Sequence, residues 1–234
     1  MCSDANRSHA EESSPSYTKR IHLIWPSNRA TDFGLLLQQG FFVPCGTGVS
    51  VRDVVCGELG VESDYLDRRI NTIFLNGKPV DDVDAAFIEA GSTLTLSASM
   101  PGLVGAVMRK GGFYAAMRCS ITHRTAAAGP AGHEKTLLRL KLLNMTANEL
   151  GPLFLQRGVL ITGSELAAFF ASRPDTFWKA WEQGSVDDEE VGPDEFRNTD
   201  WGAVSGMVHF VVNRGAEHLE VLGDEGPSPG ASSL

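Results

Sequence analysis

The chain lacks any apolar run that approaches the roughly 18 residues of a membrane-spanning helix. Its first twenty residues also lack the apolar core of a secretory signal. The four cysteines form no Cys-x-x-Cys pair, so we expect reduced thiols and a cytoplasmic protein without a membrane partner.

Motifs that carry chemistry are equally scarce. The six histidines form no His-Glu-x-x-His motif and no pair at helical spacing, which indicates no metal site. Gly46-Thr47-Gly48 lacks the Lys-Ser/Thr of a phosphate-binding loop, and Ser164 does not complete a Gly-x-Ser-x-Gly elbow. We therefore expect no catalytic residues, no metal and no cofactor.

What is present is an ordinary globular composition. The 234 residues are 42% hydrophobic and include 25 glycines, enough for one or two domains with a real core. Twenty Lys and Arg stand against 29 Asp and Glu, a net charge of −9, which argues against a general nucleic-acid binder.

Composition divides the chain into four parts. Residues 1–19 and 223–234 are rich in Ser, Gly and acidic residues and are predicted to be disordered tails. Residues 20–108 and 113–222 are predicted to be two folded segments. Whether they share one sheet stays open at this point.

The first segment predicts strands around one helix. Ser50 is a candidate N-cap for a helix over 51–59, and Asn76-Gly77 is the strongest hairpin signal. Strands are expected at 20–25, 40–44, 72–75, 78–80 and 92–97. This order is typical of an α+β fold in which a mixed sheet packs on a helix.

Four stretches, IHLIW, GFFVPCGTGVSVRDVV, IFLNGKPVDD and AGSTLTLS, occur in the order found in one family. The segment resembles the β-grasp (ubiquitin-like) sulfur carriers, namely the small subunit of molybdopterin synthase and the thiamine-pathway sulfur carrier. The resemblance implies a β-grasp domain over residues 20–108. It implies an activity less strongly, because β-grasp domains serve many purposes.

Gly111 and Gly112 are the carrier-tail candidates. Sulfur carriers end in Gly-Gly, and a partner enzyme adenylates the terminal carboxylate before it becomes a thiocarboxylate. Here the pair is internal, so the resemblance implies a carrier only after cleavage behind Gly112. The alternative is that these glycines build turns between the two segments.

The second segment predicts a compact α+β unit of its own. Extended structure is expected at 113–122, and strands are expected at 134–143, 159–162 and 207–213. Helices are expected after a capping box at Thr146–Glu149 and after Ser164 and Asp175, with a loop over 184–200.

Charge is unevenly distributed along this segment. Residues 109–141 carry seven cations and one anion, whereas residues 182–200 carry eight anions and one cation. A basic face for an acidic partner is one interpretation, and solvated strand faces are the other. The partner-binding candidates are Arg109, Lys110, Arg118, Arg124, Arg139 and Lys141.

The sequence favours a non-catalytic binding or scaffold protein with a protein partner. One alternative is a sulfur-carrier-like protein processed after Gly112, whose partner would be an adenylating enzyme. Another is an enzyme with a site between the two segments, since such sites need no linear motif.

Overall fold

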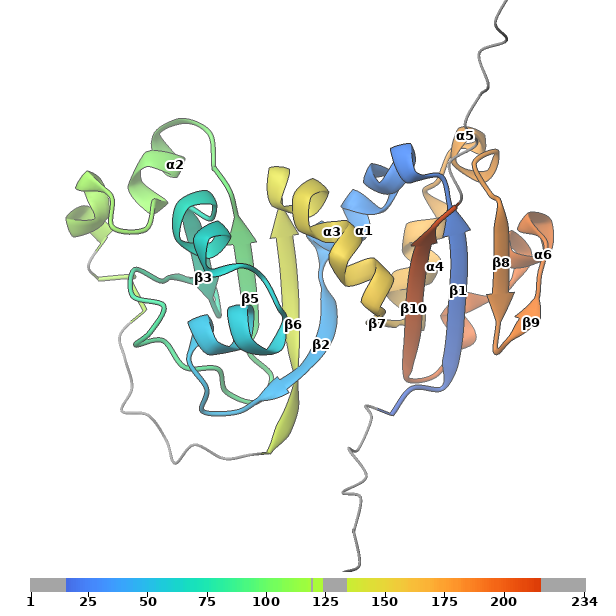
Figure 1. Cartoon of the computed structure of the whole chain (residues 1–234), viewed down its shortest axis with the longest axis horizontal. Coiled ribbons are helices and arrows are strands. Elements are labelled where there is room, and N and C mark those ends of the chain that lie inside the picture. The colour runs from blue at the N-terminus through green and yellow to red at the C-terminus, as the bar shows by residue number, and fades with distance from the viewer. Residues whose placement is uncertain (1–15, 119, 124–133, 216–234) are drawn as a thin grey trace, which may run out of the picture.

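The computed structural model describes residues 16–118, 120–123 and 134–215 as an α+β fold, in which ten strands form one mixed sheet (Figure 1). The strand order across the sheet is β4-β3-β5-β6-β2-β7-β10-β1-β8-β9. The strands are β1 Lys19–Trp25, β2 Phe41–Gly46, β3 Thr72–Leu75, β4 Lys78–Pro79, β5 Thr93–Ser97, β6 Lys135–Leu143, β7 Val159–Thr162, β8 Gln183–Val186, β9 Glu189–Glu190 and β10 Met207–Arg214.

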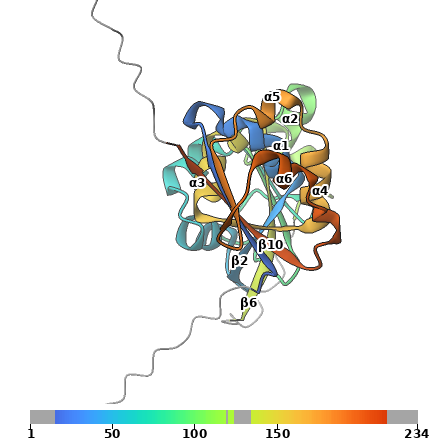
Figure 2. The ribbon, with the colours of Figure 1, turned by 90° about the vertical axis from the view of Figure 1, so that its right-hand side faces the viewer.

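Helices cover both sides of this sheet, and α3 and α4 lie on opposite sides of it (Figure 2). The α-helices are α1 Gly34–Gln39, α2 Gly102–Met108, α3 Met145–Arg157, α4 Gly163–Ala171, α5 Asp175–Trp178 and α6 Pro193–Asn198. Short 3-10 helices are η1 Ser27–Phe33, η4 Phe113–Arg118 and η5 Trp201–Ala203, and π-helical turns are η2 Asp53–Glu58 and η3 Tyr65–Arg69.

Local signals of the first segment are confirmed. The Asp53 amide donates to Ser50 Oγ (3.1 Å) at the start of the helical turn, and Val51, Val54 and Val55 are fully buried. Asn76 and Gly77 both have positive φ angles (51° and 76°), as a two-residue hairpin between β3 and β4 requires.

The structure differs from the separate β-grasp unit expected over residues 20–108, because β1 does not lie beside the other strands of that segment. β1 pairs parallel with β10 and antiparallel with β8, whereas β6 fills the place between β5 and β2. Alternation shows which face of a strand is buried but does not specify its partner. The segments 20–108 and 113–222 therefore share one sheet, and the expected boundary does not divide it.

An aromatic cluster explains the place of β1. Trp25 at its end packs against Phe33 and Phe177, with ring centroids 5.2 and 4.6 Å apart. Phe33 also contacts Phe169 and Phe210, so residues from η1, α4, α5 and β10 converge on β1. Burying aromatic rings is the largest single hydrophobic gain available to a core, and β1 supplies one of them.

Two local predictions of the second segment and one bound of the N-terminal tail were also wrong. Residues 113–118 form the 3-10 helix η4 and are not extended. The expected loop over 184–200 contains the hairpin β8–β9 and helix α6. Of the tails, Lys19 belongs to β1, while 1–15 and 223–234 lie outside the described residues.

The capping box occurs at a different helix from the one expected. Thr162 caps α4, because its side chain accepts from the Glu165 amide while Glu165 bonds back to Thr162. At the predicted position, Thr146 Oγ1 accepts from the Ala98 amide (2.7 Å), and Glu149 pairs with Arg69. Tertiary partners therefore occupy both side chains of the expected box.

Glu149 gives a pH-dependent prediction. Hydrogen bonds from Arg69 and Tyr65 lower its pKa from 4.5 to about 2, so its contribution to stability is present above pH 4.5 and is lost as the pH falls toward 2. We expect Glu149→Gln to be less stable than the parent at pH 7, with a difference that shrinks toward pH 2. Urea denaturation across that range measures it, and a pH-independent difference would contradict the assignment.

Candidate partner-binding surface

Exposed apolar side chains are concentrated in one short part of the described chain. Six of its nine exposed large hydrophobic residues lie between positions 103 and 121, and Phe113 is 92% exposed. Folded monomers rarely leave large apolar patches in water without a function. We call this set the 103–121 surface; it consists of Leu103, Val104, Phe113, Tyr114, Met117 and Ile121.

The 103–121 surface is built on two short helices, α2 and η4, that contact each other. Helix α2 packs so tightly on the preceding residues that a Cβ on Gly105 would lie 1.7 Å from the Met100 carbonyl oxygen. On η4 the rings of Phe113 and Tyr114 meet edge to face, 5.2 Å apart. The exposed side chains are therefore mounted on a packed backbone.

A buried ion pair anchors these helices to the sheet. The Arg118 side chain is 1% exposed, and its guanidinium donates twice to the Asp81 carboxylate (2.7 and 2.9 Å). The same guanidinium donates to the carbonyl oxygens of Val107 (2.7 Å) and Arg109 (3.1 Å). Arg118 thus joins the end of η4, the end of α2 and the loop after β4.

The pKa of Asp81 reflects this anchor. Burial raises the pKa of Asp81. The hydrogen bonds from Arg118 and from the Gly111 amide, together with the Arg118 charge, lower the pKa by more than burial raises it, so the pKa lies below its usual value. The carboxylate is therefore charged at neutral pH and compensates the buried guanidinium.

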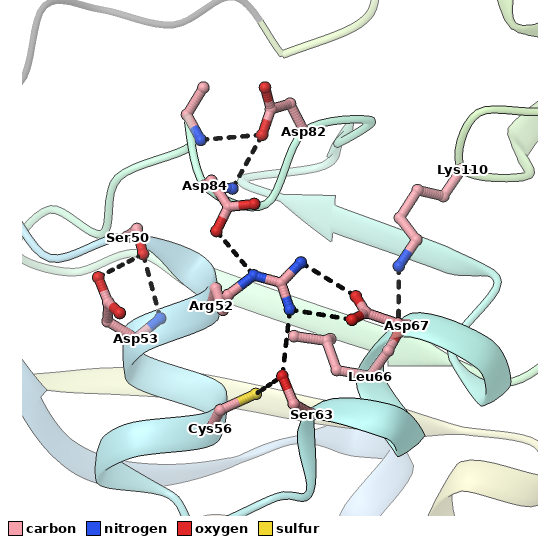
Figure 3. A network of polar contacts seen from close by, with 11 residues as sticks. Ser50, Arg52, Asp53, Cys56, Ser63, Leu66, Asp67, Asp82, Asp84 and Lys110 are labelled. Atoms are coloured by element: carbon pink, nitrogen blue, oxygen red, sulfur yellow. Dashed lines mark hydrogen bonds and ion pairs between the residues drawn. The ribbon is translucent and has the colours of Figure 1, made fainter.

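Lys110 belongs to a second polar network, shown in Figure 3. Its ammonium donates to the Leu66 carbonyl (3.0 Å), and burial lowers the pKa of this lysine. Beside it, the Arg52 guanidinium pairs with Asp67 (3.0 Å) and Asp84 (2.7 Å), which links η2, η3 and the loop after β4 (Figure 3). Lys110 therefore joins the connection between α2 and η4 to η3, which contains Leu66.

Gly111 and Gly112 form the turn between α2 and η4. Gly111 has a φ of +59°, a conformation that favours glycine, and its amide donates to Asp81 (3.0 Å). The Gly112 carbonyl accepts from the Ala115 amide (2.9 Å). Both residues belong to the folded anchor, and the bond after Gly112 leads directly into the exposed Phe113.

The remaining basic candidates are separated by the fold. Arg139 on β6 pairs with Glu165 of α4 (2.6 Å) and lies over the Phe42 ring, so this candidate for a partner-binding basic face is engaged within the protein itself. Lys141 is half-buried two residues further along the strand. Arg124 lies outside the described residues.

Charge reversal on β6 is expected to separate these two residues. Arg139→Glu should lower the free energy of unfolding by about 1–3 kcal/mol, because it places two carboxylates together and removes a charged hydrogen bond. Lys141→Glu is the matched control, and we expect a change within about 0.5 kcal/mol. Urea denaturation measures both, and equal effects would contradict a structural role for the Arg139–Glu165 pair.

Arg109 is the exposed cation of this region. Within the described ranges, no hydrogen bond or ion pair engages its guanidinium. It lines a small pocket beside α2 together with the polar residues Asn71, Thr72 and Ser99. Arg109, Lys110 and Arg118 are therefore brought together by the fold, but only Arg109 is available to a partner.

Other chemistry is limited in the described residues. They contain no group of three or more His, Cys, Asp or Glu side chains placed to hold a metal ion. Burial raises the pKa of the Cys45 thiol to about 12, which leaves it an inert thiol at neutral pH. No helix in these ranges combines the length and hydrophobicity that crossing a membrane requires.

Comparison of the chain with known family models, curated proteins and solved structures gave no match.

Proposed function

We propose that this chain is a non-catalytic binding or scaffold protein and that the 103–121 surface contacts its protein partner. The observation that carries the proposal is the concentration of exposed apolar side chains on α2 and η4. A loose segment would have to lose much conformational entropy on binding, whereas the Arg118–Asp81 pair already holds this one in place. Apolar residues on a pre-ordered backbone are typical of a docking surface.

We also propose that the sheet beneath this surface is β-grasp-like. In its support, β2, the helical turn over 51–58, the hairpin β3–β4 and β5 follow one another in the expected order. The sequence resemblance assigned β1 to this unit, and β6 now stands beside both β2 and β5.

Photocrosslinking in living cells of the native host tests the binding proposal. A photoreactive phenylalanine analogue at Phe113 is expected to give one dominant crosslinked partner, identified by mass spectrometry. The same analogue at Tyr17, which is also exposed but lies beside β10, is the matched control. Equal crosslinking at both positions, or none at Phe113, would contradict the proposal.

A second candidate function is the sulfur-carrier-like protein processed after Gly112. The observation that favours it is the position of the Gly112–Phe113 bond, next to a side chain that is 92% exposed. Cleavage there would still leave one sheet, because β1 and β2 pair with strands of the second segment. The two products would therefore stay together in a native preparation.

Denaturing mass spectrometry of the protein from its native host decides between the two candidates. We expect the intact chain, in agreement with the binding proposal. A dominant fragment ending at Gly112, with the mass increase for exchange of one carboxylate oxygen for sulfur, would instead establish the carrier. A variant with Gly112→Ala, which should block such processing, is the control for the origin of the fragment.

A further inference from the structure

We infer that the partner segment which covers the 103–121 surface is acidic as well as apolar, and that one of its carboxylates pairs with Arg109. This inference rests on the proposed binding function and specifies the chemistry of the partner. Its first support is the sequence itself, because no Asp or Glu occurs between residues 90 and 133. The surface and its connections are thus built entirely from apolar, neutral and basic residues.

The second support is the distribution of charges around the surface. The nearby carboxylates already have partners: Asp81 binds Arg118, and both Asp67 and Asp84 bind Arg52. Asp82 accepts from the backbone amides of residues 84 and 85. Arg118 is buried and Lys110 donates to the Leu66 carbonyl, so among the residues that the structure describes Arg109 is the exposed, unpaired cation beside α2.

The third support is that Arg109 lines a polar pocket beside α2. The pocket that it lines carries the hydroxyl-bearing residues Thr72 and Ser99, and α2 borders it through Gly105 and Ala106. Leu103 and Val104 project from the same short helix and are 75% and 57% exposed. Arg109 follows the last residue of this seven-residue helix, so a segment that lies along α2 and covers these two residues is short of Arg109 by no more than the length of the helix.

Net charge favours a protein partner over a lipid surface. Anionic membranes attract basic segments by about 1 kcal/mol per lysine or arginine near the surface. The net charge of this chain is −9, so a bilayer with anionic lipids would repel the chain as a whole. The contact between such a bilayer and the exposed Arg109 would be the opposing attraction. An acidic peptide segment carries far fewer negative charges than a membrane surface, so the net charge of the chain opposes its contact with Arg109 less.

Selection from a displayed library of random 16-residue peptides against the full-length chain tests the inference. We expect the enriched peptides to be net negative, with apolar residues at helical or alternate spacing. Their binding should be lost with Phe113→Ser and weakened about tenfold or more by Arg109→Glu. Lys179→Glu, an exposed lysine after α5, and Leu35→Ser, on α1, are the matched controls and should bind as the parent does.

Distinct outcomes would overturn the inference. Enriched peptides that are neutral or basic, yet still require Phe113, would leave the binding function standing and reject the acidic partner. Binding to phosphatidylcholine vesicles that appears only when phosphatidylserine is added would assign the surface to membranes. Concentration-dependent dimerisation that Phe113→Ser abolishes would assign it to a second copy of the chain.

Discussion

Replacing Asp81 with alanine is expected to lower the free energy of unfolding by about 3 kcal/mol, because it leaves the buried Arg118 guanidinium without its carboxylate. Urea denaturation at pH 7 measures the loss. Asp82→Ala is the matched control, since the Asp82 carboxylate caps exposed backbone amides and should cost about 1 kcal/mol. The double change Asp81→Ala with Arg118→Met should recover part of the loss, because no buried charge then remains.

The stability that the Asp81–Arg118 pair contributes depends on pH. The folded pKa of Asp81 lies below its usual value of 3.8, so the stability from the pair is present above that value and is lost as the pH falls below it. The parent should therefore lose stability in this acidic range more steeply than Asp81→Ala. If Asp81→Ala were as stable as the parent at pH 7, the anchor would not be holding α2 and η4.

Residues 20–108 expressed alone are expected not to fold. Without β6 nothing joins β5 to β2, and without β8 and β10 nothing pairs with β1. We expect poorly dispersed amide resonances in two-dimensional NMR and no cooperative urea transition. The full chain, treated in the same way, is the control.

Adding residues 109–234 in trans should restore dispersion, because that fragment supplies every missing strand. A folded and cooperative 20–108 fragment would contradict the shared sheet. It would mean instead that residues 20–108 form a domain of their own, as the β-grasp resemblance implies.

What the sequence predicts well is local. The hairpin at Asn76-Gly77 and the helix start at Ser50 depend on neighbouring residues, and both are as expected. The alternating leucines of β6 likewise specify its buried face, since Leu138, Leu140 and Leu142 are fully buried. Backbone preference and burial periodicity suffice for features of this kind.

What the sequence does not predict is which distant groups meet. Phe113 and Tyr114 have high strand propensity but lie in the 3-10 helix η4. The turn at Gly111 precedes this helix, and the hydrogen bonds from Arg118 to Asp81 fix its end. That ion pair spans 37 residues and leaves no local pattern. The partner of β1 is equally remote, because β10 lies about 190 residues later and the aromatic cluster that holds β1 there joins residues from distant elements.

The sequence predicts only part of the 103–121 surface. The basic residues around Gly111 and Gly112 lie in the segment that carries this surface, but the sequence predicts a basic face for a partner and not exposed apolar side chains. The informative residues are the apolar ones between Pro101 and Arg109, because Pro101 precedes a short helix and nothing in the described chain covers Leu103. Exposure is a property of the folded chain, so periodicity could not show it.

The pairing of β1 has a consequence for synthesis on the ribosome. Lys19 pairs with Val208, about 190 residues later, and β8, the other neighbour of β1, is also far along the chain. At typical rates of 5–20 residues per second, β1 emerges about 8–33 s before β8 and about 10–40 s before β10. During that interval the strands that pair with β1 do not yet exist, so three side chains that are buried in the folded protein, Ile21, Leu23 and Trp25, are exposed. The nascent chain can therefore aggregate, and we expect chaperones to bind it.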